Sequence, residues 1–273
     1  MKMTISRSNA FAIAMAGALV APAFAFAQTT ATATPVAQVR VAAAPTIRPG
    51  EFYAAPYVER DGGPPNAGRI VGTGDVPGIP LTESERPLQS YERVFVTLPP
   101  GMSNAVGTRY VAVRRGPNLE GVGQVMEPTA IVTVLRAQPG QAVEARIVAR
   151  FAPVEIGNEL VTMEAVPANL AKPSATSGVR TTALWVQGEP VLPSLQSYVI
   201  VEGNSASGMR VGDQITFYRE RRTTTDGTVL PESDIAVAQI VRVTAQASTA
   251  IVIDQTYGAI GEGSVARVSA KMP

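Results

Sequence analysis

The feature that most constrains this chain is an internal repeat. The tetrapeptide Leu-Gln-Ser-Tyr occurs at Leu88–Tyr91 and again at Leu195–Tyr198, which is 195 − 88 = 107 positions later. Both copies continue into Gly-Met, then Val-Gly, and then into an alternating strand pattern that ends in arginine. A length of 273 residues allows one large domain or two ordinary ones, and the repeat favours one β-rich module written twice.

Each copy contains about six short strand patterns separated by glycine-rich turns. In the first copy Ala130–Leu135 is almost entirely apolar, and Val143–Phe151 alternates between apolar and polar residues. In the second copy Ile235–Val243 and Thr249–Ile253 occupy the corresponding places. Strands of this length with turn signals between them predict an all-β fold with two tandem small antiparallel β-barrel or sandwich modules. The alternative is a single intertwined sheet.

The first 27 residues have the three parts of a secretory signal. Lys2 and Arg7 form the positive start, and Ala10–Val20 is an apolar segment that is shorter than the roughly 20 helical residues needed to span a bilayer. Ala25–Ala27 supplies small residues for cleavage before Gln28. The sequence therefore predicts a periplasmic or cell-envelope protein with no transmembrane span after cleavage. The alternative is an uncleaved amino-terminal anchor.

Behind the signal, clusters of proline and glycine mark the divisions of the chain. The aromatic residues Phe52, Tyr53 and Tyr57 lie in the proline-rich part, where they either dock on a partner or fold back on their own domain. The predicted divisions are a signal peptide at 1–27, a flexible leader rich in Ala, Pro and Thr at 28–65, a first β module at 66–165, a linker at 166–178 and a second β module at 179–273.

Composition excludes several classes of function. The chain has no cysteine and no histidine, so disulfides, thiol nucleophiles, Ser-His-Asp catalysis and the usual zinc sites are ruled out. Its net charge is +1 and 16% of its residues are charged, without the basic stripe that nucleic-acid binding requires. We therefore expect no cofactor and no metal. A carboxylate hydrolase would need Asp213, Asp226 and Asp234 to converge, whereas Asp213 beside Gly212 is typical of a carboxylate that stabilises a turn.

The two copies share a set of glycine-anchored turns and strands. In the first copy these are Gly101, Val106 and Gly107, with Thr108 in the place of Asp213. In the second they are Gly208, Val211, Gly212, Asp213, Tyr218, Arg219, Ile240–Val243, Ala250–Ile253, Ile260, Gly261 and Gly263. This pattern resembles a module of bacterial envelope proteins: it is similar to the β-barrel module found beside LysM domains and to the carboxy-terminal domain of flagellar assembly protein T, although no LysM sequence is present here. The resemblance implies an extracytoplasmic assembly or scaffold role without catalytic residues.

These observations predict an exported, non-catalytic interaction or scaffold subunit that joins an envelope protein complex. The alternative is a peptidoglycan- or glycan-binding module, which would need Tyr57, Tyr91 and Trp185 to be exposed together as stacking faces. Trp185 lies in the apolar run Ala183–Val186, which favours a place in the core or between the modules. The candidate contact residues are Tyr57, Tyr91, Trp185 and Asp213.

Overall fold

The computed structural model describes residues 47–60, 62–74, 86–167, 173–176, 178–188, 195–256 and 260–273. All of them belong to one compact unit, Gln38–Pro273. The predicted signal peptide and residues 28–46 of the predicted leader lie outside this description. Within the described ranges, no helix has the length and apolar character needed to cross a membrane.

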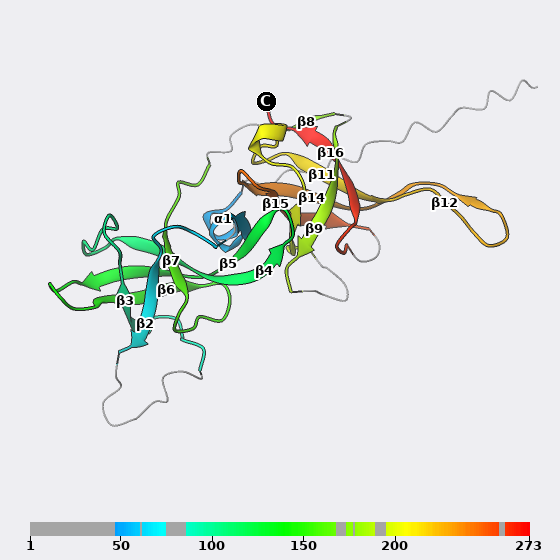
Figure 1. Ribbon diagram of the computed structural model, residues 1–273. Helices are drawn as coiled ribbons and strands as arrows, with labels where there is room; N and C mark the ends of the chain where they lie inside the picture. The colour runs from blue at the N-terminus through cyan, green and yellow to red at the C-terminus, as the bar shows by residue number, and fades with distance from the viewer. Residues whose placement is uncertain are drawn as a thin grey trace, which may run out of the picture. The chain divides into compact units, whose positions relative to one another are not determined.

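The first half of the described chain forms a closed antiparallel barrel (Figure 1). Its sheet has the order β1-β5-β4-β7-β2-β3-β6, and β5 also pairs with β6, so that β2 to β7 make a complete ring. β5 continues beyond the end of β6, and β1 pairs with this extension. The strands are β1 (Tyr57–Glu59), β2 (Gly68–Thr73), β3 (Arg93–Thr97), β4 (Arg109–Leu119), β5 (Gly123–Arg136), β6 (Val143–Arg150) and β7 (Glu159–Thr162).

The second half forms a barrel with the same connectivity. Its sheet has the order β11-β14-β15-β10-β9-β16-β8, and β11 also pairs with β16 to close the ring. The two short strands β12 and β13 pair only with each other in this description, as a hairpin between β11 and β14. The strands are β8 (Ser174–Ala175), β9 (Arg180–Val186), β10 (Tyr198–Val201), β11 (Gln214–Arg219), β12 (Arg222–Thr223), β13 (Val229–Leu230), β14 (Ser233–Val243), β15 (Ser248–Gln255) and β16 (Val265–Lys271).

The two tandem barrels confirm the predicted fold class, and they exclude the intertwined sheet because each large sheet takes its strands from one half of the chain. Equivalent hydrogen bonds relate the copies. Gly107 N donates to Val134 O at 2.9 Å, and Gly212 N donates to Ile240 O at 2.7 Å. Both glycines have a positive φ, of 87° and 96°, a conformation that glycine adopts without a steric penalty. The turn that precedes β4 therefore has the same conformation as the turn that precedes β11.

The structure corrects the register of the repeat at its most conspicuous point. Tyr91 N donates to Ile147 O, and Gln196 N donates to Val252 O, both at 2.8 Å. The φ angles of Tyr91 and Gln196 are 68° and 70°, so these two residues are structurally equivalent. Tyr91 is the fourth residue of its tetrapeptide, whereas Gln196 is the second residue of the other. Their separation is 196 − 91 = 105 positions, two fewer than the separation of the identical tetrapeptides. The identity of the tetrapeptides is thus out of structural register by two residues.

A similar shift occurs before the closing strands. Gly157 N donates to Ile70 O, and Gly263 N donates to Ala183 O, both at 2.8 Å. The structural counterpart of Gly157 is therefore Gly263. Gly263 has a φ of 79°, whereas Gly261 is absent from the described glycines with positive φ.

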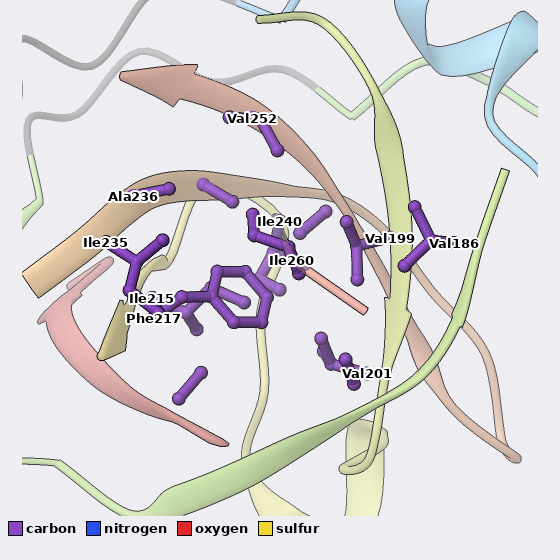
Figure 2. Close-up of a cluster of buried hydrophobic side chains, with 14 of the residues drawn as sticks. Val186, Val199, Val201, Ile215, Phe217, Ile235, Ala236, Ile240, Val252 and Ile260 are labelled. Atoms are coloured by element: carbon purple, nitrogen blue, oxygen red, sulfur yellow. The ribbon is translucent and has the colours of Figure 1, made fainter. Parts of the chain in front are cut away.

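Each barrel is filled by the inward-facing residues of its own strands. In β3 the exposed and buried residues alternate strictly, as expected for a sheet with one face in a core and one outside. Figure 2 shows the core of the second barrel, in which the ring of Phe217 lies among aliphatic side chains. These include Val186, Val199, Val201, Ile215, Ile235, Ala236, Ile240, Val252 and Ile260.

Part of the predicted flexible leader is ordered, which corrects the boundary drawn at residue 65. Helix α1 (Pro49–Ala54) and strand β1 follow one another, and Phe52, Ala55 and Val58 are buried. Burial of these apolar side chains removes their surface from water, and the free energy gained favours an ordered segment over a flexible one. The predicted linker 166–178 also contains a paired strand, β8, which adds to β16, while residues 168–172 and 177 lie outside the described ranges. The remaining structural element is a single turn of 3₁₀ helix, η1 (Ser205–Ser207).

Candidate interaction surfaces

The aromatic residues predicted to make contacts do not share a surface. Tyr57 in β1 is 5% exposed and Trp185 in β9 is 4% exposed, whereas Tyr91, in the turn before β3, is 73% exposed. The glycan-binding alternative requires all three rings to face solvent together. Two of them lie inside the protein, so this set of stacking faces is not formed.

Asp213 is fully buried in the turn before β11. Its carboxylate accepts the backbone N–H of Arg210 at 3.0 Å and that of Met272 at 2.8 Å, and Lys271 Nζ lies 3.9 Å away. The prediction that Asp213 stabilises a turn is confirmed. It also ties the carboxyl end of β16 to that turn, and its burial removes it from any contact surface.

The other acids named for hydrolysis lie elsewhere. Asp226 is in the exposed turn between β12 and β13, and Asp234 is in β14 with its carboxylate 3.4 Å from Arg267. Within the described part of the chain, no three acidic side chains gather closely enough to hold a metal ion. The convergence that a carboxylate hydrolase requires is therefore not found for Asp213, Asp226 and Asp234.

The structure instead identifies a contact between the two barrels. The β4–β5 hairpin extends beyond its own barrel, and its tip reaches the outer face of β9 and β10. Leu119, Val122 and Val125 of this hairpin, together with Val58 of β1, form one apolar cluster with Leu184, Trp185, Ile200 and Ala247 of the second barrel. We call this cluster the docking contact. Its central residues Val125 and Ile200 are both 0% exposed, so this contact excludes water completely at its centre.

Residues 47–59 reinforce the docking contact. Helix α1 packs on the outside of β14 and β15 through Phe52, Val241 and Ile251. The guanidinium of Arg242 lies 3.8 Å from the centre of the Tyr57 ring and 5.4 Å from that of Phe52, a cation–π arrangement. Burial of the Tyr57 phenol raises its pKa to about 12, although the charge of Arg242 opposes this effect.

Hydrogen bonds complete this junction. Thr249 Oγ1 donates to Pro56 O at 2.6 Å, and Tyr198 Oη donates to Glu51 O at 3.0 Å. Arg242 also donates to Glu164 at 2.8 Å. The segment before the first barrel is thus bonded directly to the second.

One margin of the docking contact is open. A cleft of about 580 Å³ lies where the hairpin residues Gly121 and Val122 approach the second barrel. Its walls include Leu184 and Met209 together with the charged residues Arg180 and Lys271. The junction is therefore apolar at its centre, and charged side chains join apolar ones where it meets this cleft.

The second barrel has a corresponding hairpin with no comparable cover among the described residues. It is formed by β12 and β13, and Figure 1 shows it extending away from the strands of the barrel. Val229 at its tip is 57% exposed. The turn is nevertheless well organised, because Asp226 accepts hydrogen bonds from Thr224 and from Thr228 N. The Thr224 hydrogen bond is the main cause of a lowered Asp226 pKa.

The first barrel has an exposed apolar face on β2 and β3. Val71 is 41% exposed and Phe95 is 37% exposed, although both lie in regular strands. Neither this face nor the hairpin tip that covers the second barrel was predicted from the sequence. The available signal was the outward position of Phe95 between Arg93 and Thr97, where an exposed strand face normally carries polar residues.

Neither a scan against protein-family models nor a search of the curated proteins returns a match for this sequence. The function must therefore be argued from the two barrels and their surfaces.

Proposed function

We propose that this protein is an exported, non-catalytic scaffold subunit, and that it binds a protein partner of the cell envelope through the β12–β13 hairpin. The exported location rests on the predicted signal in residues 1–27. The partner site rests on one observation, the exposed hairpin with Val229 at its tip. A two-stranded hairpin is only marginally stable in water by itself, so an organised hairpin outside a closed barrel favours a role in binding.

The chemistry of the hairpin supports protein recognition. Most strands of the molecule are paired on both sides inside a closed ring, whereas β12 and β13 each have one neighbour among the described strands. Unpaired strand edges bind other chains by adding a strand, and apolar side chains beside the edge supply further affinity. The equivalent hairpin of the first barrel already contacts a protein surface, that of the second barrel, through apolar side chains and without strand pairing between the described strands.

Photo-crosslinking in the native envelope tests this function. A photoreactive amino acid at Val229 is expected to give a discrete protein adduct, identified by mass spectrometry. The matched control is Val106, which is 73% exposed but belongs to the turn before β4. No adduct from position 229, or the same adducts from 106 and 229, would contradict the proposal. Recovery of wall fragments instead of protein would favour glycan binding.

A further inference from the structure

The docking contact occurs once in the chain, but the parts needed for it occur twice. It joins a donor, the hairpin tip of the first barrel, to an acceptor, the outer face of β9 and β10. The acceptor has a defined geometry: Trp185 pairs with Ile200, Ala183 pairs with Val201, and Leu184 is left over in a β-bulge. Bulges of this kind aim side chains that would otherwise point elsewhere.

The first barrel repeats this acceptor residue by residue. Gly72 pairs with Phe95, Ile70 pairs with Val96, and Val71 is left over in the same bulge. Phe95 is thus the counterpart of Ile200. Ile200 is fully buried by the docked hairpin, whereas 37% of Phe95 is exposed. Among the described residues, the acceptor face of the first barrel is therefore less covered than that of the second barrel.

One difference leaves open space on the free acceptor where the occupied one carries a large ring. The position of Trp185 is taken by Gly72, and a Cβ placed on Gly72 would have no heavy atom within 4 Å. An incoming apolar side chain can therefore settle against Phe95 above Gly72. In the occupied contact the acceptor supplies the ring of Trp185 and the donor supplies valines. The free acceptor likewise supplies a ring, that of Phe95 on the neighbouring strand, and the second hairpin supplies Val229 and Leu230.

The second barrel repeats the donor. Arg114 pairs with Glu127 at the base of the first hairpin, and Arg219 pairs with Ser233 at the base of the second. Beyond these pairs the two hairpins contain 126 − 114 = 12 and 232 − 219 = 13 residues, so their tips extend to similar lengths. The second tip carries Val229 and Leu230.

We propose that the β12–β13 hairpin of one copy of this protein docks on the β2–β3 face of a second copy, so that copies join head to tail. This inference rests on the proposed function and names its partner as the same chain. It extends the contact already present inside the molecule. Within one copy the hairpin of the first barrel docks on the second barrel, and between copies the hairpin of the second barrel docks on the first barrel of the next copy. Such a contact joins different surfaces of the two partners, and it builds a closed ring or an open filament.

Charged residues frame both partners. Arg69 and Arg93, which flank the free acceptor on β2 and β3, have side chains that are each 60% exposed, and they form ion pairs with Glu159 and Glu144. The hairpin carries Asp226 in its turn and the exposed Arg222 opposite Leu230. The pairing therefore depends on apolar contact and not on a difference in net charge.

The test uses the complete chain, expressed with its own amino-terminal segment and purified from the envelope fraction, in analytical ultracentrifugation. At roughly 100 μM, well above the Kd of a micromolar contact, the unmodified protein is expected to form assemblies larger than a dimer. Val229→Asp removes the donor and Phe95→Asp removes the acceptor. Each is expected to weaken association by about tenfold or more, since either change buries an unpaired charge in an apolar contact. Val106→Asp is the exposed control and should associate normally.

Mixing the two defective variants gives the decisive result. Val229→Asp keeps its acceptor and Phe95→Asp keeps its donor, so an equimolar mixture is expected to form a one-to-one dimer and nothing larger. A mixture that stays monomeric, or an unmodified protein that is monomeric at this concentration, would overturn the inference. Gly72→Leu, which fills the open space beside Phe95 without adding charge, should block association as Phe95→Asp does. Circular dichroism of each variant verifies the fold.

The same experiments separate the two proposals. If Val229 crosslinks to a different envelope protein while the purified chain remains monomeric, the scaffold function stands and self-assembly is wrong. If Val229 forms no protein adduct in the envelope, the scaffold function itself is contradicted.

Discussion

The two barrels have the same strands in the same order, yet their outer faces differ. On the second barrel the outward positions of β10 and β15 carry Tyr198, Ile200 and Ile251, all covered by the segment 47–59 or by the first hairpin. On the first barrel the corresponding positions carry Arg93, Phe95 and Arg146, which are exposed. The inward-facing residues are apolar in both barrels, whereas the outward-facing residues are apolar where another part of the protein covers them and mostly charged where they are exposed.

This difference shows where the repeat carries information about binding. An inward position must be apolar in both copies because it fills a barrel core. An outward position is free to vary, so an apolar residue there indicates a covered surface. Phe95 is the exception that remains apolar without the cover found on Ile200. The following changes test this comparison between equivalent positions.

The largest difference is expected between Ile200 and Phe95. Ile200→Ala removes a fully buried side chain from the docking contact and should lower the free energy of unfolding by about 2–5 kcal/mol. Phe95→Ala, at the equivalent partly exposed position, should cost about 1 kcal/mol or less under monomeric conditions. Denaturant unfolding followed by the fluorescence of Trp185 measures both. Equal losses would show that the two faces are covered alike.

The next effect concerns the turn before the third strand of each barrel ring. Asp213→Ala leaves the backbone N–H groups of Arg210 and Met272 without their acceptor and should destabilise the protein by about 2–3 kcal/mol. Thr108→Ala, the equivalent change in the first barrel, should cost about 0.5 kcal/mol, since Thr108 lies nearer the surface. Thermal unfolding of both variants provides the comparison. A loss at Thr108 as large as that at Asp213 would contradict the assigned role of the carboxylate.

A smaller effect is expected at two equivalent arginines. Arg242 stacks on two aromatic rings, and its side chain is 10% exposed, whereas the side chain of Arg136 is 67% exposed. Arg242→Ala should cost about 2 kcal/mol through lost cation–π contact and lost packing of its stem. Arg136→Ala should stay within about 0.5 kcal/mol. Limited proteolysis near residue 60, compared between these variants, will report whether the segment 47–59 loosens only when Arg242 is replaced.

The smallest effect is a dependence on alkaline pH. The Tyr57 pKa is raised by burial from 10.0 to about 12 in the folded state, so the folded protein holds this proton more tightly than the unfolded chain. Its stabilising contribution is complete below the unfolded pKa, and is lost as the pH rises from about 10 towards 12. The expected loss from Tyr57 is about 1 kcal/mol between about pH 10 and about pH 11. Burial raises the Tyr198 pKa as well, which adds in the same direction.

Urea unfolding at these pH values tests this linkage. Tyr57→Phe should flatten the decline in stability, whereas Tyr91→Phe, at an exposed phenol, should leave its slope unchanged. If both variants decline as the unmodified protein does, Tyr57 does not govern the alkaline transition.

The sequence was sufficient for the fold class, the duplication and the role of Asp213, because these follow from alternation, turn glycines and local hydrogen bonding. The sequence was insufficient for the register of the repeat. The identical tetrapeptides align Tyr91 with Tyr198, whereas the positive φ angles show that Tyr91 is equivalent to Gln196. The sequence also did not predict that residues 47–59 form regular structure. Prolines at positions 49 and 56 indicate a break in regular structure, but Pro49 begins α1, where a missing N–H costs nothing.

The covering of one barrel by the other could not be derived from local pattern alone. Leu119 and Val122 in a polar turn are compatible with a free loop until the surface that receives them is known. Contacts of this kind depend on the relative placement of two modules, which no periodicity within either module encodes. The matched bulges at Val71 and Leu184 similarly became visible only in the strand pairing.

The position of the segment 47–59 has a consequence for the timing of synthesis. Pro56 accepts a hydrogen bond from Thr249, which lies 193 residues later in the chain. At about 5–20 residues per second, a ribosome needs roughly 10–40 s to make the residues between them. Phe52 therefore leaves the ribosome long before its partners Val241 and Ile251 have been made, whereas Val58 can already pair with β5 of the first barrel. Helix α1 is thus made before either barrel but is among the last elements to complete its native contacts.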